Sequence, residues 1–418
     1  MTPIARRAAA LALVATAWVS AGAHPFAEAL SEASAPIDFT RDYVSARAHL
    51  AGVDVRDQDA GNTYAETIGA PRVVLLGAPY HAHPPTAAFV VTPLATLGFA
   101  GAALAWLALS LSALAVLAFV LAAVVTREDR PSPSTVTLTF LLLASWPPVL
   151  HNLAKGQWSI LLAALIALGW RAFERGHARA AGVLLGVAAS LKATPILLLG
   201  FLALRHRRAA AAMALTLAGI VLASLAAFGV EPWREWVVNA QPNALAWRTW
   251  TANTASLGGL FARLFTLSAY ARPITEAPAL AQALTLGATA LLVTVAALTS
   301  RRARSSGEPA LFALWAAAAV VLNPLGWTHT TVMALLPIAL LARDGVSPAV
   351  LVVFVALTVP RQTLAVLAGP VPVSPARGLA LSLHAGALLV LIAAARSRTL
   401  AGAAMIPNSK SGAYTAPQ

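Results

Sequence analysis

The chain contains no cysteine and has few charged residues for its length. Asp, Glu, Lys and Arg together make up only 11% of its 418 residues, where soluble globular chains carry about a quarter. The absence of cysteine excludes disulfides and thiolate metal sites and leaves the redox compartment undetermined. With 59% hydrophobic residues and a mean hydropathy of +0.74, the composition excludes a soluble protein, because a soluble core could not enclose this much apolar surface.

Acidic residues are scarcer than basic ones, with 16 Asp and Glu against 29 Lys and Arg. A formal charge of +13 could indicate nucleic-acid binding, but the basic residues are placed in short clusters between apolar runs. This is the positive-inside pattern of loops that face an anionic cytoplasmic leaflet. We therefore expect no nucleic-acid partner. The clusters are Arg6-Arg7, Arg127/Arg130, Arg171/Arg175/Arg179, Arg205/Arg207/Arg208, Arg301/Arg302/Arg304, Arg343 and Arg396/Arg398.

Apolar runs such as Ala100–Val125 and Ala279–Leu298 recur along the whole chain and leave no room for a soluble domain. They predict an all-α integral membrane protein of the plasma (inner) membrane, a polytopic bundle of about 12 transmembrane or re-entrant helices, several shorter than the ~20 residues of a full span. Residues 1–396 form this single membrane-embedded domain. Residues 397–418 are rich in Pro, Ser and Gly and are predicted to be a disordered cytoplasmic tail.

The N-terminal apolar run Ala8–Ala23 follows Arg6-Arg7 and has two interpretations. An uncleaved first helix makes the charge clusters alternate sides correctly; a cleaved signal peptide is the alternative. The next stretch, residues 24–85, is the longest polar segment before the tail, and parts of it, such as Asp42–Ala51, have helical composition. It is predicted to be a long extracytoplasmic loop with surface helices.

The remaining hydrophobic segments follow from hydropathy and charge. Pro84–Leu97 is predicted to be a short helix at the membrane surface, followed by the long span Gly98–Val125. The other expected membrane segments are Thr135–Leu150, Trp158–Phe173, Ala209–Phe228, Ser256–Phe265, Ala279–Leu298, Ala310–Leu322, Thr330–Leu341, Ala349–Ala365 and Leu379–Ala395.

Two segments between the long apolar runs are predicted to depart from simple membrane crossings. His151–Gln157 is expected to be a tight outer turn. Ala180–Leu204 lies between two cytoplasmic Arg clusters, so a single crossing cannot account for it. A hairpin of two short or re-entrant helices, broken at Ser190–Pro195 because Pro195 ends the first helix, resolves the conflict. Such a break is tolerated where it lines a wet cavity, which would place Lys192 at the floor of a cavity open to the outside.

Polar residues that border membrane helices are costly and are therefore candidates for function. In this chain they lie at the predicted outer ends of the helices, whereas the cytoplasmic loops contain no Gly-rich phosphate-binding motif. An enzyme on the outer face without a nucleotide site needs a lipid-linked phosphate ester as its activated donor. The candidates are Asp38, Arg41, Asp42, His81, His83, His151, Asn152, Lys155, Gln157, Lys192, Arg248, Asn253, Asn323 and His329.

Transfer from such a donor needs a carboxylate to take a proton from the acceptor hydroxyl and cations to balance the departing phosphate. Asp38 is the preferred carboxylate, with a solvated or helix-capping role as its alternative, and Asp42 competes with it, with an ion pair to Arg41 or Arg47 as its alternative. Lys192 is the preferred phosphate partner, with a capping role as its alternative. Lys155 and Arg248 could assist, with a surface charge as the alternative for each, and His329 could bind the phosphate or assist proton transfer, with a structural capping role as its alternative.

One pair of histidines could bind a metal ion. His81 and His83 have the spacing of a two-ligand site. The Pro84-Pro85 that follows favours a structural turn, so no metal site is predicted.

Six short motifs in order resemble glycosyltransferase family 87, whose members have the C-type membrane glycosyltransferase fold and use polyprenyl-phosphate sugars. One departure is Asp42, where an aromatic residue is more usual, and it leaves the choice of base between Asp38 and Asp42 open. The motifs are Asp38-Phe39 with Ala46 and Gly52, Tyr80–Pro85 with Thr92-Pro93-Leu94, Asn152 with Gly156-Gln157, Ala181-Gly182 with Ser190–Pro195, Asn253 with Ser256-Leu257, and Asn323-Pro324 with Trp327-Thr328-His329.

The resemblance implies a hexosyltransferase that moves a sugar, with mannose as the best guess and arabinose as the alternative, to a lipid or glycan acceptor on the extracytoplasmic face. It implies inversion at the anomeric carbon and a catalytic Asp38. From the residues themselves, a helping role is assigned to His329, phosphate binding to Lys192, Lys155 and Arg248, and substrate contacts to Asp42, Asn152, Gln157 and Asn253. The resemblance implies no nucleotide, no cofactor and no essential metal, and protein partners stay undetermined.

Two other functions are compatible with the sequence. A transporter or flippase for a lipid-linked saccharide would also use a wet cavity, but it predicts charges along both halves of its pathway. Here the cytoplasmic half offers almost none. A non-catalytic assembly subunit is the third possibility.

Overall fold

A computed structural model describes residues 23–73, 80, 83–240, 254–268, 271–343, 347–360, 363 and 375–404. Within these residues the secondary structure is helical, and the β structure is limited to one isolated antiparallel bridge between Thr254 and Trp327. The all-α prediction is thereby confirmed. The segment predicted to be a first helix or a signal peptide lies, up to residue 22, outside the described residues.

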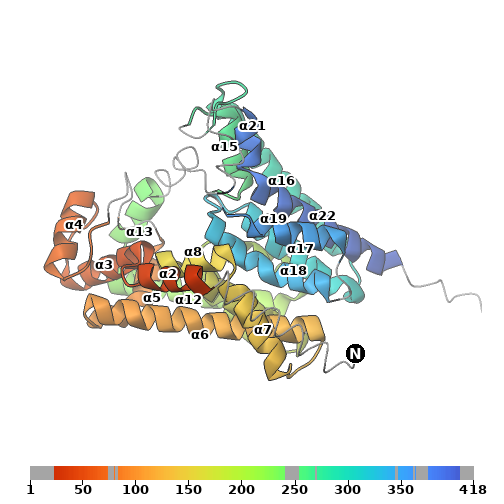
Figure 1. Ribbon diagram of the computed structural model, residues 1–418, viewed down its shortest axis with the longest axis horizontal. Coiled ribbons are helices and arrows are strands. Elements are labelled where there is room, and N and C mark those ends of the chain that lie inside the picture. Colours follow the sequence, from red (N-terminus) through yellow and green to blue (C-terminus); the bar gives the residue numbers. More distant parts are fainter. Residues whose placement is uncertain are drawn as a thin grey trace, which may run out of the picture.

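The predicted extracytoplasmic loop, residues 24–85, contains α2 (Ala23–Glu32), α3 (Ile37–Ala51) and α4 (Gln58–Thr67). The short helix predicted over Pro84–Leu97 corresponds to α5 (Pro85–Val91) and the 3₁₀ turn η2 (Leu94–Thr96). Figure 1 shows α3 and α4 beside one end of the long helix α6 (Phe99–Thr126).

Helix α3 lies in the protein core and not on the surface, because every residue from Phe39 to Ala46 is buried, polar ones included. Phe39, Tyr43 and Val44 are fully buried, and α3 contacts both α5 and α6. Tyr43 donates its hydroxyl to the carbonyl of Leu97 at 2.8 Å, and burial raises the pKa of this phenol. Gly52 ends α3 in the left-handed conformation, with φ of 66°, that favours glycine at this position.

Four helices in the described part of the chain are long and apolar enough to cross a membrane. They are α6, α12 (Arg207–Phe228), α16 (Pro278–Arg302) and α22 (Leu383–Ala404). A fifth crossing arises if α7 (Pro133–Ala144) and α8 (Pro147–Lys155) together make one bent span. By length and composition, four or five spans are therefore established in the described residues, whereas the sequence predicts about 12 transmembrane or re-entrant helices.

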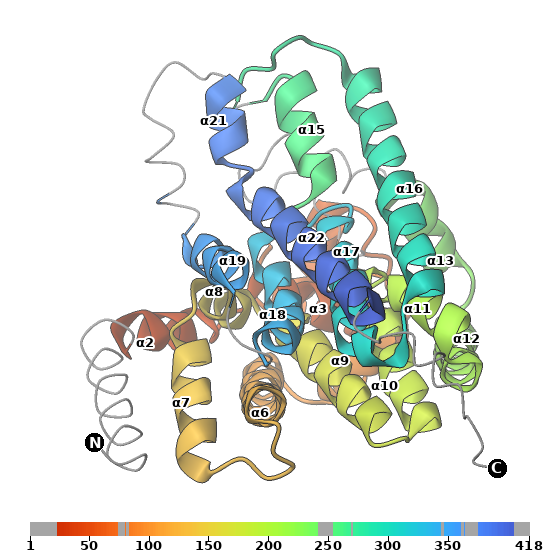
Figure 2. The same ribbon diagram turned by 90° about the vertical axis from the view of Figure 1, so that its right-hand side faces the viewer.

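The other described elements are short. They are α9 (Ser159–Glu174), α10 (Ala178–Leu191), η3 (Thr194–Leu197), α11 (Leu198–Arg205), α13 (Glu231–Glu235), the π-helical turn Trp236–Ala240, α15 (Leu257–Phe265), η5 (Ser305–Gly307), α17 (Glu308–Val321), η6 (Thr328–Ala334), α18 (Leu335–Ala342), α19 (Pro348–Thr358) and α21 (Pro375–Ala380). In both views α15 and α21 lie together at the top of the molecule, away from α6 (Figures 1 and 2).

The span predicted over Thr135–Leu150 is broken. Helices α7 and α8 meet at an angle of 70°, because Pro147 and Pro148 have no backbone N–H to continue α7 and instead occupy the first turn of α8. The outer turn predicted over His151–Gln157 was therefore wrong in extent. His151 to Lys155 are helical, and the turn itself is at Gly156, with φ of 67°.

The break predicted within Ser190–Pro195 is present. Helix α10 ends at Leu191, Lys192 has extended backbone angles (φ −152°, ψ 134°), and the chain resumes as η3 at Thr194. Helix α10 packs against both α9 and α12. The Lys192 side chain is thus displayed from a short non-helical segment between packed helices.

Two C-terminal predictions need correction. The helix predicted over Thr330–Leu341 begins as the 3₁₀ segment η6 and becomes α-helical only at Leu335. Helix α22 continues to Ala404, so residues 397–404, predicted to be disordered, are helical. The rest of the predicted tail, residues 405–418, lies outside the described residues.

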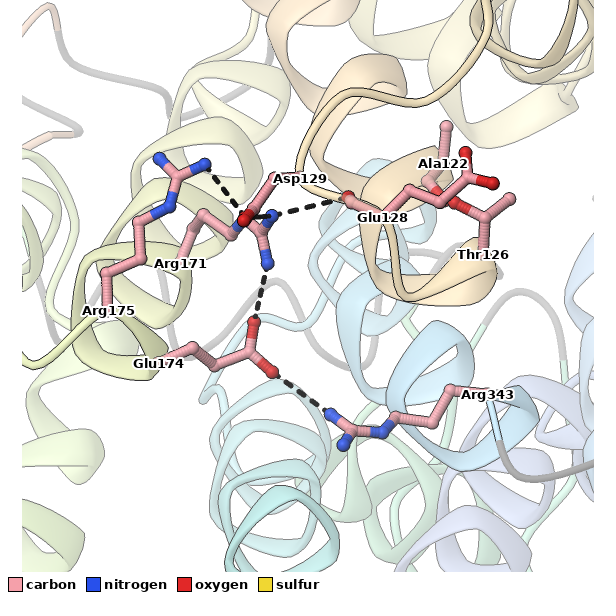
Figure 3. A network of polar contacts seen from close by, with 8 residues as sticks. All are labelled: Ala122, Thr126, Glu128, Asp129, Arg171, Glu174, Arg175 and Arg343. Atoms are coloured by element: carbon pink, nitrogen blue, oxygen red, sulfur yellow. Dashed lines mark hydrogen bonds and ion pairs between the residues drawn. The ribbon is translucent and has the colours of Figure 1, made fainter.

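One Arg cluster forms an ion-pair network at the C-terminal end of α9 (Figure 3). Arg171 bridges Asp129, in the α6–α7 connection, and Glu174, and Arg175 reaches Asp129 at 3.2 Å. Glu174 in turn pairs with Arg343, at the end of α18, at 3.0 Å. Single exposed pairs contribute little to stability, but this network connects three elements at the end of α9 opposite to Trp158.

Candidate active site

Asp38 lies in the first turn of α3 and is partly accessible. Its side chain is 16% exposed, and its Oδ1 lies 3.6 Å from Nη1 of the buried Arg41. A carboxylate in the first turn of a helix is favoured by the helix dipole. Asp38 therefore combines a negative charge, a neighbouring cation and access from outside.

The turn at Gly156 brings the start of α9 against α3. A Cβ atom on Gly156 would lie 2.6 Å from Cβ of Pro36 and 2.8 Å from Cβ of Phe39, so only glycine fits this approach. Trp106 of α6 stabilises the contact by donating its indole N–H to the Gly156 carbonyl at 3.1 Å and by stacking on Phe39 at 5.0 Å between centroids. The next two residues of the turn, Gln157 and Trp158, consequently reach the site.

Asp42 is one helical turn beyond Asp38 and has a different environment. Its side chain is 4% exposed. Its Oδ2 accepts the indole N–H of Trp158 at 2.8 Å, and both of its oxygens lie 3.0 Å from Nδ1 of His83. Asp42 is thus buried and held by protein groups, whereas Asp38 is the more accessible carboxylate.

Lys192, in the break after α10, reaches the turn that carries Gln157 and Trp158. Its ammonium donates to Oε1 of Gln157 at 3.0 Å. The charges of Asp38 and Asp42 both act on it, Asp38 the more strongly. Thr86 of α5 donates its hydroxyl to the Ser190 carbonyl and so connects the segment after His83 to the end of α10.

His329 completes the set from η6. It is 3% exposed, and within the part of the chain that the structure describes neither ring nitrogen has a hydrogen-bond partner. Its ring lies 5.5 Å from that of His151 between centroids, and the charges of Lys192, His151 and His83 act on it. A buried imidazole without hydrogen bonds is unusual and suits a residue that contacts a bound substrate.

The position of η6 depends on a contact between distant segments. Thr254 and Trp327 form the isolated β-bridge, and the Ala255 N–H donates to the Gly326 carbonyl at 2.5 Å. The buried Arg263 of α15 holds Thr254 through its hydroxyl at 2.6 Å and its carbonyl at 3.0 Å.

The profile of glycosyltransferase family 87 matches residues 80–325. The chain belongs to glycosyltransferase family 87. No curated protein and no solved structure matches it significantly. Family membership makes the protein a membrane glycosyltransferase, in agreement with its apolar helices. The matched segment includes His83, Gln157 and Lys192, while Asp38 and His329 lie outside it.

The remaining site residues predicted for this family 87 enzyme have other placements. Lys155 lies 3.5 Å from Glu32 of α2 in an ion pair at the surface. Asn152 is buried. When its side-chain amide is oriented so that both its nitrogen and its oxygen are hydrogen-bonded, it donates to the Gln157 carbonyl at 2.9 Å and accepts the Ser159 N–H at 3.1 Å. These bonds stabilise the turn. Two further candidates, Arg248 and Asn253, lie outside the described residues.

The sequence predicts no role in the reaction for two residues that lie in the candidate site, His83 and Trp158. In the sequence His83 is a general polar candidate whose one specific role is in a His-x-His metal pair, and its pair-mate His81 lies outside the described residues. Trp158 was regarded as the start of a membrane helix. In the described part of the chain no three His, Asp or Glu side chains gather as metal ligands. The one sequence signal for both residues is a polar N–H group beside an apolar helix start.

Proposed function

We propose that this family 87 glycosyltransferase transfers a sugar from a polyprenyl-phosphate donor to a hydroxyl group of a lipid or glycan acceptor, at the extracytoplasmic face of the plasma membrane. The sugar we propose is mannose, with arabinose as the alternative suggested by the family resemblance. The shorter apolar helices would complete a C-type bundle of about 12 transmembrane or re-entrant helices. The observation that carries the proposal is that Gln157 and Trp158, neighbours in one turn, hydrogen-bond Lys192 and Asp42 respectively, and Asp42 lies one helical turn from Asp38 on α3.

The chemistry follows from the two charges. The acceptor oxygen attacks the anomeric carbon, its proton passes to the Asp38 carboxylate, and the bond from the anomeric carbon to the phosphate oxygen breaks with its electron pair left on the phosphate. Lys192 offers a positive charge to the phosphate, whose negative charge increases as it leaves. Attack opposite the leaving phosphate inverts the anomeric configuration.

The environments of the two carboxylates support Asp38 as the base. Asp42 already accepts hydrogen bonds from Trp158 and His83 and is almost completely buried. Asp38 has one ion-pair contact, with Arg41 at 3.6 Å, and is more exposed. An acceptor hydroxyl therefore reaches Asp38 more readily. Gln157 would orient the Lys192 ammonium through their hydrogen bond.

The test is an Asp38→Asn variant in membranes supplied with a prenyl-phosphate sugar and an acceptor lipid extract. General-base catalysis contributes about 10²–10⁴-fold, so we expect transfer to fall about 1,000-fold with unchanged expression, and we expect the wild-type product to have the inverted anomeric configuration by NMR. Undiminished transfer in Asp38→Asn would refute the assignment of the base. Movement of an intact lipid-linked saccharide without transfer would instead favour a flippase.

A further inference from the structure

Asp42 and His83 form a carboxylate–imidazole pair beside the proposed base. Asp42 is in the middle of α3, and His83 immediately precedes the Pro-Pro start of α5. Nδ1 of His83 lies 3.0 Å from both carboxylate oxygens, and the two side chains are 11% and 4% exposed. The indole N–H of Trp158 holds the same carboxylate from a third element. The pair is thus fixed by packing and hydrogen bonds from α3, α5 and α9.

This contact leaves the other ring nitrogen available. A carboxylate only accepts hydrogen bonds, so Nδ1 carries the proton in this contact. Within the described residues Nε2 has no hydrogen-bond partner. It is also not one of the side-chain nitrogen and oxygen atoms that are both buried and unpaired. His83 acts electrostatically on His329, which Lys192 also affects. His83 and Lys192 therefore belong to one site, joined by the hydrogen bonds from His83 through Asp42 to Trp158 and from its neighbour Gln157 to Lys192.

We propose that His83 is a further catalytic residue, which donates a hydrogen bond from Nε2 to the departing phosphate, and that Asp42 is its positioning residue. The inference rests on the proposed function. When the bond from the anomeric carbon to the phosphate oxygen breaks, the electron pair stays on that oxygen and the phosphodiester monoanion becomes a monoester dianion. With both ring nitrogens protonated, His83 donates Nδ1–H to Asp42 and Nε2–H to this oxygen, and the proton stays on His83. The acceptor proton goes to Asp38, so the atoms and charges balance.

Asp42 then has a clear reason to be buried and doubly held. Its carboxylate balances the imidazolium charge and fixes the ring orientation, as an orienting carboxylate does for a catalytic histidine in a triad. It does not compete with Asp38 for the acceptor proton. The two aspartates of α3, one turn apart, thus act on opposite sides of the anomeric carbon: Asp38 on the attacking hydroxyl and Asp42, through His83, on the departing phosphate.

Two substitutions of His83 separate this role from a structural one, because Asn places its amide N–H near the position of Nδ1 and Gln places it near the position of Nε2. His83→Asn keeps a donor for Asp42 but removes the donor to the phosphate, and we expect kcat to fall about 100-fold, the effect of deleting one preorganised donor, with KM for the donor nearly unchanged. His83→Gln keeps a donor near Nε2, and we expect kcat within about 10-fold of wild type. The opposite ranking, with Asn near wild type and Gln impaired, would show that His83 only satisfies Asp42 and would overturn the proposal.

A double-mutant cycle and a rescue experiment complete the test. The losses in Asp42→Asn and His83→Asn are expected to be strongly non-additive, because the two residues act as a unit; additive losses would contradict the pair. In His83→Ala, added imidazole is expected to restore part of kcat, and no restoration in a variant that purifies folded would count against the proposal. If wild-type enzyme transfers no sugar from a prenyl-phosphate donor, the proposed function itself fails. If wild type is active and His83→Asn is equally active, only the role of His83 fails.

Discussion

At the scale of single residues, the environment distinguishes side chains that the sequence presents as equivalent. Asp38 and Asp42 are one turn apart on α3, yet only Asp42 is held by Trp158 and His83. Lys155 and Lys192 both follow apolar helices, yet Lys155 is exposed beside Glu32 and Lys192 meets Gln157. A charge that is buried in a site acts more strongly than one in water, because the surrounding dielectric is lower.

Lys192→Ala is expected to weaken donor use. The variant removes the cation nearest to the proposed phosphate position, so we expect KM for the prenyl-phosphate sugar to rise at least about 10-fold, since a charge-assisted hydrogen bond contributes about 1.5–3 kcal/mol. Steady-state kinetics at varied donor concentration measures this. Arg72→Ala is the matched control, because Arg72 is an exposed cation that pairs with Glu66. An unchanged donor KM in Lys192→Ala would remove this residue from the site.

At the scale of elements, helix interiors followed from local sequence and helix ends did not always do so. The apolar runs placed α6, α12, α16 and α17 to within a few residues, and Pro195 marked the break after α10. The bend before α8 was missed, although Pro147-Pro148 signalled it, because hydropathy continues across Ser145 and Trp146. The core position of α3 also lies beyond local reasoning, because its polar as well as its apolar residues are covered by elements distant in the chain, such as α6 and α8.

Gly156→Ala is expected to damage the site through the α8–α9 turn. The new Cβ would meet both Pro36 and Phe39, which have no free space. Gly52→Ala is the matched control, because Gly52 also ends a helix at positive φ but has no atom within 4 Å of the new Cβ.

Both variants carry the backbone strain of about 1–2 kcal/mol, and only Gly156→Ala adds an overpacking cost of about 1–3 kcal/mol. Thermal unfolding of the purified enzyme in detergent, together with kcat, checks this. Equal destabilisation by the two substitutions would contradict the close approach of this turn to α3.

At the scale of the whole molecule, the charge distribution predicts which end faces the cytoplasm. The Arg171–Asp129–Glu174–Arg343 network lies at the end of α9 opposite to the turn that carries Gln157 and Trp158 (Figure 3). By the positive-inside rule the Arg-rich end faces the cytoplasm. The site around Asp38 and Lys192 would then open on the extracytoplasmic side.

Single cysteines test this orientation, because the chain has none of its own. Thr63→Cys, exposed on α4, is expected to react with a membrane-impermeant maleimide in intact cells. Glu128→Cys, exposed in the α6–α7 connection, is expected to react only after the membrane is permeabilised. Retained transferase activity in both variants serves as the folding control. Labelling in the reverse order would place the site on the cytoplasmic face.

The sequence by itself determined that this protein is a helical membrane protein, where most of its long helices lie and where the Lys192 break falls, because hydropathy and proline effects act over neighbouring residues. The tertiary structure alone decided that α3 is a core helix, that Asp42 contacts His83 and Trp158, and that Lys192 meets Gln157. These contacts join residues far apart in the chain, and their partners are selected by packing, which leaves no periodic signal in a single sequence.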